Sequence, residues 1–146
     1  MTQSEIVDET IAYYSKDVSR RSIIVSPNAE LTTCMYQGPK PEQMCAVGRC
    51  LLPDLRKEMV KNPSFNQGGI TRVVQTNNKD HDAILDDESF NKCLQEKYRG
   101  HSFEFWKALQ GLHDTNKYWD EEGLTEEGTE EANKISTEIF KSLHYD

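Results

Sequence analysis

Apolar residues at helical spacing near both ends of the chain constrain its fold most strongly. At the N-terminus, Thr2 and Glu5 match the capping box of a helix start. The apolar residues that follow recur every three or four positions, and they are Val7, Ile11, Tyr14 and Val18. Because this periodicity gives a helix one apolar face, the sequence predicts an opening helix that packs on a core.

The second half of the chain carries three further helix signals. Asp87, Ser102 and Thr125 are residue types that cap helix N-termini, and each precedes apolar residues at helical spacing. These apolar positions are Phe90 and Leu94, then Phe105, Leu109 and Leu112 with Trp106 beside them in the core, and finally Ala132, Ile135, Ile139 and Leu143. The domain is therefore predicted to be mainly helical.

A small antiparallel β element is predicted around residues 22–52. Residues 21–25 are short and β-branched, and residues 31–36 form a second strand candidate. The sequence at 26–28 is a turn signal, and the prolines of 38–41 favour an extended loop. Two or three short strands in a mostly helical chain define an α+β fold.

The central part of the chain is harder to interpret. Residues 45–52 are apolar and compact, which suits a strand or a short helix. Pro53 begins a polar helical segment that continues to Val60. Residues 62–80 are polar and contain glycine, so they predict a mobile loop, with an edge strand at 70–74 as the alternative. We expect one α+β domain over residues 1–146.

Charge and hydropathy exclude several classes of protein. The longest apolar run is well short of the ~18 residues that span a bilayer, and the first residues lack the features of a signal peptide. We therefore expect a cytosolic protein without a membrane partner. Residues 1–79 hold ten Lys/Arg and eight Asp/Glu, whereas residues 80–146 hold seven and seventeen. The resulting charges of +2 and −10 disfavour general nucleic-acid binding.

A thiol site is one candidate for chemistry. The four cysteines show irregular spacing without a CxxC pair, so neither a zinc site nor another metal or cofactor is indicated. Cys45 precedes a predicted helix, a position that lowers the pKa of a thiol. With His113 as base and Asp114 as orienting group, it would form an activated nucleophile. The alternative interpretation is that the thiols are reduced and buried, and that His113 hydrogen-bonds near its helix end.

An anion pocket is a second candidate, because arginines flank residues 34–54. The planar guanidinium group donates paired hydrogen bonds to phosphate, and aromatic rings can stack on a nucleobase. The candidate ligand-binding residues are Arg20, Arg21, Arg49, Arg56, Tyr36, His113 and Trp119. The alternative is a solvated basic edge that pairs with the acidic second half. The acidic run at 120–131 likewise suits either a helix start or a surface that docks on a basic partner.

Three short motifs give the chain a family resemblance. Residues 34–39 (CMYQGP), 45–54 (CAVGRCLLPD) and 109–114 (LQGLHD) resemble the C-x-Y-R-G-P, C-A-V-G and L-Q-x-x-H-D elements of an uncharacterised family of small tailed-bacteriophage and prophage proteins. Trp119 and the GLTEEG sequence at 123–128 are also similar to the C-terminal part of that family. Gln37 departs from the family's arginine, and the loop at 41–43 is longer.

The resemblance implies a phage-encoded accessory protein in the cytoplasm of the infected bacterial host. From this resemblance we expect a protein that interferes with a host process, with antiviral defence as the first candidate. Together with the lack of common catalytic motifs, this favours a non-enzymatic protein that binds a small anionic nucleotide or a bacterial host protein. The alternatives are a thiol-dependent hydrolase that uses Cys45 and His113, and an oligomerising protein of the virion.

Overall fold

The computed structural model describes residues 1–25 and 32–137, which form a mainly helical α+β fold. The described helices are α1 (Gln3–Lys16), α2 (Pro53–Val60), α3 (Thr71–Asn78), α4 (Asp87–Asn91), α5 (Phe103–Asp114) and α6 (Glu126–Thr137). The strands are β1 (Ile23–Val25), β2 (Thr32–Cys34), β3 (Trp119–Asp120) and β4 (Gly123–Leu124). The predicted fold class is confirmed.

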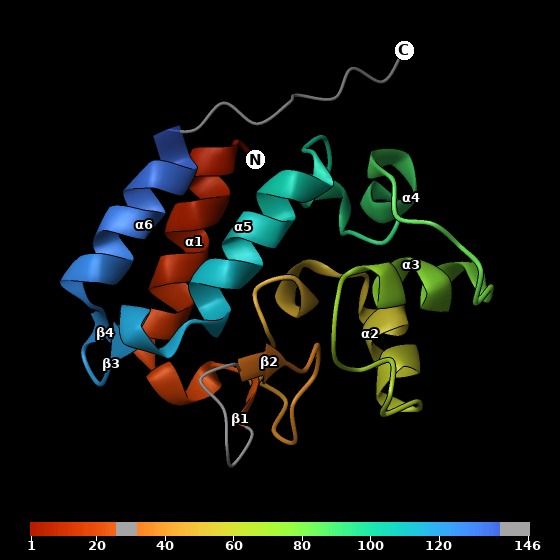
Figure 1. Cartoon of the computed structure of the whole chain (residues 1–146), viewed down its shortest axis with the longest axis horizontal. Helices are drawn as coiled ribbons and strands as arrows, with labels where there is room; N and C mark the ends of the chain where they lie inside the picture. The colour runs from red at the N-terminus through yellow and green to blue at the C-terminus, as the bar shows by residue number, and fades with distance from the viewer. Residues whose placement is uncertain (26–31, 138–146) are drawn as a thin grey trace.

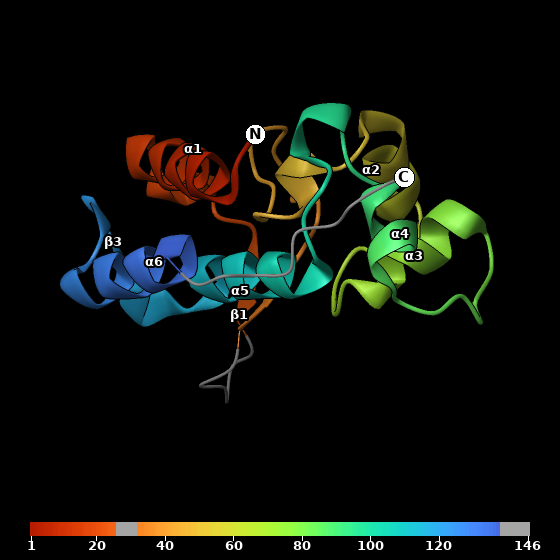
Figure 2. The same ribbon diagram turned by 90° about the horizontal axis from the view of Figure 1, so that it is seen from above.

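The helices fall into two groups that α5 connects. In Figures 1 and 2, α1, α5 and α6 lie at one end of the molecule and α2, α3 and α4 at the other. Helix α6 contacts both α1 and α5, and α5 also contacts α4 and β2. Helix α5 therefore lies between the two groups and also contacts the sheet (Figure 1).

Several helix starts follow the predicted side-chain caps. The Thr2 hydroxyl accepts from the Glu5 N–H at 3.1 Å, and the Glu5 carboxylate accepts from the Thr2 N–H at 2.9 Å, which completes the capping box. Ser102 caps α5, as expected. Helix α4 is capped by Asp86 instead of Asp87. The Asp87 carboxylate accepts from the backbone N–H of Phe103 at 2.8 Å and so ties α4 to the start of α5.

The predicted β element is a two-stranded antiparallel sheet. Strands β1 and β2 pair with Ile23 opposite Cys34. The turn predicted at 26–28 lies outside the described residues. The 45–52 segment is a 3₁₀ turn at Gly48–Cys50 followed by a single bridge from Leu51 to Leu94. A second hairpin, β3 with β4, was not predicted, because two-residue strands leave no periodicity to detect.

The segment 62–80 differs from the prediction. Residues 71–78 form α3, where the sequence suggested an edge strand or a loop. The helix buries Val73 and Val74 and contacts α2 and α4. The polar composition of this segment gave no sign of a helix, because so short a helix is stabilised by tertiary packing and not by local propensity.

The core joins both groups of helices. Its largest fully buried side chains include Trp106, Tyr14, Tyr36, Phe90, Phe105 and Ile6. Trp106 is therefore a core residue, as predicted, and so are Ala132 and Ile135 of α6. Ile139 and Leu143 lie outside the described residues. Within residues 1–25 and 32–137, no helix is long and apolar enough to cross a membrane.

Candidate binding site

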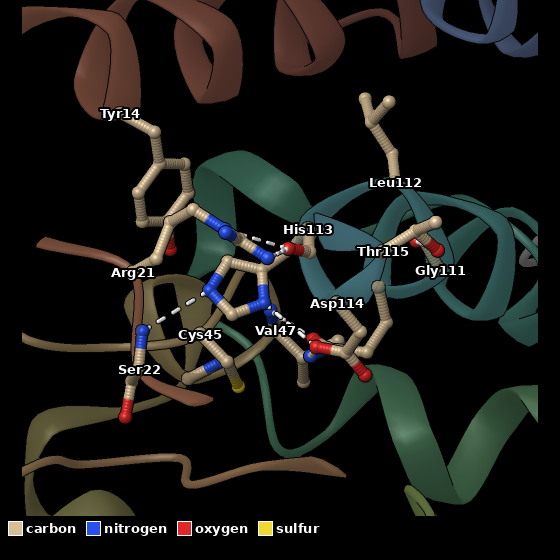
Figure 3. A network of polar contacts seen from close by, with 12 residues as sticks. Tyr14, Arg21, Ser22, Cys45, Val47, Gly111, Leu112, His113, Asp114 and Thr115 are labelled. Atoms are coloured by element: carbon tan, nitrogen blue, oxygen red, sulfur yellow. Dashed lines mark hydrogen bonds and ion pairs between the residues drawn. The ribbon is translucent and has the colours of Figure 1, made fainter. Parts of the chain in front are cut away.

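The second and third sequence motifs meet at the C-terminal half of α5, where His113 is the central residue and Cys45 and Val47 lie beside it (Figure 3). Its ring is fully buried, 4.9 Å from the ring of Tyr14. The backbone N–H of Ser22 donates to Nε2 at 3.3 Å, and Nδ1 lies 2.7 Å from Oδ1 of Asp114. Because Nε2 accepts, the ring proton is on Nδ1 and is donated to Asp114. Burial lowers the pKa of His113, although the hydrogen bond to Asp114 opposes this shift.

A hydrogen-bonded relay links the second motif to the third. The backbone N–H of Val47 donates to Oε1 of Gln110 at 3.0 Å, and Nε2 of Gln110 donates to Oδ1 of Asp114 at 2.8 Å. The Asp114 carboxylate thus accepts from two buried side chains, Gln110 and His113. The Asp114 side chain is 23% exposed. The relay therefore fixes a carboxylate that still reaches solvent.

The first two motifs also pack directly on one another. The thiols of Cys34 and Cys45 are hydrogen-bonded, and this bond, together with burial, raises the pKa of Cys34. The Tyr36 hydroxyl donates to the carbonyl of Gly68 at 2.8 Å. A Cβ on Gly48 would lie 2.1 Å from the carbonyl oxygen of Tyr36, so only glycine fits there. These contacts give Cys34, Tyr36, Cys45 and Gly48 roles in packing the two motifs together.

A pocket of about 350 Å³ opens beside this network; we name it the α5 pocket. One wall is a face of α5, and the opposite wall is the end of β2 with the loop that precedes α3. The lining residues are Lys107, Gln110, Gly111 and Asp114 on α5, and Cys34, Gly68, Gly69 and Ile70 across from them. The relay therefore holds Asp114 at the wall of a cavity.

The predicted arginine pocket does not form around Arg49. Its side chain is 8% exposed and forms an ion pair with Glu9. The guanidinium also donates to Thr10 at 3.0 Å and to Tyr98 at 3.2 Å. Arg49 thus joins α1 to the 3₁₀ turns at Gly48–Cys50 and Glu96–Tyr98. Its charge is balanced inside the protein.

The other three candidate arginines, unlike Arg49, donate to backbone carbonyls, and Arg20 does so to that of Tyr13 at 3.3 Å. Arg21 donates twice to the carbonyl of His113, at 2.9 and 2.7 Å, and Arg56 donates to that of Gly48 at 3.0 Å. Arg20 stacks on the Tyr13 ring, 4.7 Å from its centroid. Arg56 and Lys57 line a smaller pocket of about 220 Å³. The four arginines therefore brace the fold and do not converge on one cavity.

The two aromatic ligand candidates are buried. Trp119 is 6% exposed, and its indole N–H donates to the carbonyl of Leu112 at 2.8 Å. Tyr36 is fully buried. Trp119, a candidate for stacking on a nucleobase, is not exposed for that contact, because its pairing in the β3–β4 hairpin holds the ring against Tyr14, with centroids 5.7 Å apart.

Other predicted features lie away from the α5 pocket. The acidic run spans the β3–β4 hairpin and the first turns of α6, with an exposed ion pair between Lys117 and Glu127 at 3.6 Å.

The part of the chain that the structure describes contains no group of three or more His, Cys, Asp or Glu side chains arranged to hold a metal ion. All four cysteines are buried and form no disulfide.

Of the α5 residues that line the pocket, the sequence singled out Asp114 as a candidate site residue but not Lys107, Gln110 or Gly111. Lys107, Gln110 and Asp114 recur at helical spacing. Gly111 lies inside the same helix, and a Cβ built on it would meet no atom within 4 Å. An unexplained glycine inside a capped helix, flanked by polar residues on one face, is the signal that could have located the pocket.

Comparison of the chain with family models, curated proteins and solved structures finds no match. The site is therefore interpreted from its own geometry.

Proposed function

We propose that the chain is a non-enzymatic binding protein that holds a small molecule in the α5 pocket. The observation that carries this proposal is the relay from Val47 through Gln110 to Asp114. A polar group that is fixed before the ligand arrives loses little entropy on binding. The pocket's ≈350 Å³ lies at the lower end of the 300–1,000 Å³ range that is typical of small-molecule sites.

The geometry favours binding over thiol catalysis. A Cys–His nucleophile requires the imidazole nitrogen that faces the thiol to accept its proton. In this protein Nε2 of His113 accepts from the backbone of Ser22 instead. Cys45 is fully buried, and the raised pKa of Cys34 opposes thiolate formation at the pocket wall. The thiol-dependent hydrolase is therefore the less favoured alternative.

The proposed ligand binds at the α5 pocket and not at Arg49, which the sequence had suggested. An anion at Arg49 would have to displace Glu9 from a buried ion pair, whereas Lys107 is exposed at the α5 pocket. The cationic group that meets an anionic ligand is thus Lys107. The volume of the α5 pocket, about 350 Å³, is that of a small-molecule site, so we propose a small molecule and not a segment of host protein as the ligand.

We further propose that this protein is a phage-encoded accessory protein that acts on a process of the infected bacterial cell, most plausibly antiviral defence. The support is the motif resemblance and the clustering of those motifs at the α5 pocket. A binding protein of this kind would sequester a host signal and release it chemically unchanged. A virion protein would instead assemble without a ligand, which light scattering of the purified chain would reveal.

The test is to identify what the protein carries. Wild-type protein is purified from phage-infected bacteria and denatured, and the released small molecules are identified by mass spectrometry. Gly111→Val places a side chain in the pocket, and Ala12→Val places the same side chain on the exposed face of α1. We expect a molecule released from wild type and Ala12→Val but not from Gly111→Val. Equal release from all three, or release of a converted product, would contradict the proposal.

A further inference from the structure

The first two motifs bring a pair of thiols into contact. Cys34 is the last residue of β2, and its thiol is hydrogen-bonded to that of Cys45. The backbones on either side are also in contact, because a Cβ on Gly48 would lie 2.1 Å from the carbonyl oxygen of Tyr36. Packing of the β2 end on the segment at 45–50 therefore holds the two sulfur atoms together.

The two thiols differ in their hydrogen bonds and in their access to solvent. The Cys45 sulfur accepts from the backbone N–H of Gly48 at 3.3 Å, and its side chain is fully buried beside His113 (Figure 3). Cys34 is 3% exposed and lines the open α5 pocket. A small solute in the pocket thus meets Cys34 first, and Cys45 is the second thiol behind it.

The other two cysteines have different surroundings. Cys93 donates to the carbonyl of Ser89 in α4 at 3.4 Å, and Cys50 is fully buried at the end of a 3₁₀ turn. A free cysteine in a core usually packs as a small apolar residue, and both of these residues fit that role. Cys34 differs from them, because it combines a thiol partner with a place at the wall of a pocket.

We infer that Cys34 and Cys45 are a redox-active pair that a peroxide converts to a disulfide. The peroxide transfers one oxygen atom to the Cys34 sulfur, which gives a sulfenic acid and one molecule of water. The Cys45 sulfur then attacks that of Cys34, and the S–S bond forms as the hydroxyl group leaves with the Cys45 proton as a second water. The two thiols lose two electrons, which the peroxide gains. A dithiol reductant restores both thiols.

The disulfide links the end of β2 to the turn at Gly48–Cys50 and alters the wall of the α5 pocket at Cys34. Disulfides of this kind in cytosolic proteins are usually transient and sense the redox state. Burial and the hydrogen bond to Cys45 raise the pKa of Cys34, so the oxidation is slow and is followed over hours. The inference does not depend on the ligand of the pocket or on the proposed function.

Mass spectrometry of the folded full-length chain after treatment with hydrogen peroxide tests the inference. The protein is first reduced and freed of reductant, and after oxidation the remaining thiols are alkylated in urea. Trypsin with a glutamate-specific protease separates the four cysteines onto residues 31–42, 43–49, 50–56 and 93–96. We expect 31–42 linked to 43–49, with full reversal by dithiothreitol. Four free thiols, or a linked fragment that contains Cys50 or Cys93, would overturn the inference.

Three variants distinguish a redox pair from two thiols that only pack together. In Cys45→Ala the second thiol is missing, so oxidation should stop at the sulfenic acid of Cys34, which dimedone traps. In Cys34→Ala the buried Cys45 should stay free. Cys50→Ala is the matched control and should form the disulfide as the wild type does. Circular dichroism checks that each variant folds. A folded Cys45→Ala that dimedone does not label, or a Cys50→Ala that forms no disulfide, contradicts the inference.

Discussion

The backbone N–H of Ser22 donates to Nε2 of His113 at 3.3 Å, and this contact determines the state of the imidazole. The ring is held neutral, with its proton on Nδ1 and donated to Asp114. Both nitrogens are thereby used to join the start of β1 to the end of α5. His113 thus orients Asp114, and its Nε2 is already occupied by the Ser22 N–H.

We expect stability to fall when the pH drops below about 6.5. Burial lowers the pKa of His113 from its ordinary value of 6.5. Above pH 6.5 the imidazole is neutral in both states; below it, the unfolded chain binds a proton that the folded protein excludes. The free energy of unfolding should then decrease by at most about 1.4 kcal/mol per pH unit from this group. Urea denaturation at pH 7.5 and pH 5.5 measures the change.

His113→Gln is the control for this pH dependence. The variant removes the titrating group, so its unfolding free energy should depend less on pH over the same interval. An identical dependence in wild type and His113→Gln would assign the effect to other groups.

The ion pair of Arg49 with Glu9 is expected to stabilise the link between α1 and the Gly48–Cys50 turn. Glu9→Gln leaves the buried guanidinium without its counter-charge, which should cost about 3 kcal/mol of unfolding free energy. Glu58→Gln is the matched control, because Glu58 pairs with Lys61 at the exposed surface at 2.8 Å. Its effect should be below about 1 kcal/mol. If chemical denaturation shows that both substitutions lower the free energy of unfolding equally, then leaving the buried guanidinium of Arg49 without Glu9 carries no additional cost.

Local signals in the sequence predicted the helices that begin at strong caps. Thr2, Ser102 and Thr125 cap helix starts that the structure contains, and Pro53 occupies the first position of α2. Helix α3 was missed, because its stability comes from Val73 and Val74 packing against distant helices. A capping residue can be recognised in the sequence itself. The tertiary contacts that stabilise a short polar helix cannot be recognised there.

The candidate site was predictable in its components but not in its pairings. The sequence identified His113 and Asp114 and the stretch they contact. It could not show that Glu9, forty residues away, neutralises Arg49, or that Arg21 and Arg56 bind backbone carbonyls. An arginine suits a phosphate and an internal carbonyl equally well, and only the fold decides between them.

The native thiols are expected to react slowly. Burial raises the pKa of Cys50 and of Cys93 to about 12, from 9.0. At pH 8 this lowers their thiolate fraction roughly a thousandfold. An aromatic disulfide reagent should therefore label the folded protein far more slowly than the protein in urea. One rapidly labelled thiol in the native state, identified by its loss in Cys45→Ala, would instead support the thiol-dependent alternative.

Two glycine-to-alanine changes should have opposite effects on stability. In Gly48→Ala the new Cβ would lie 2.1 Å from the carbonyl oxygen of Tyr36, so the two motifs must separate, at a cost of about 3 kcal/mol. In Gly111→Ala the new methyl group meets no atom within 4 Å, and the gain in helix propensity should stabilise the protein by about 0.5–1 kcal/mol. Urea denaturation of both variants provides the comparison. A destabilised Gly111→Ala would mean that the structure around α5 requires this glycine.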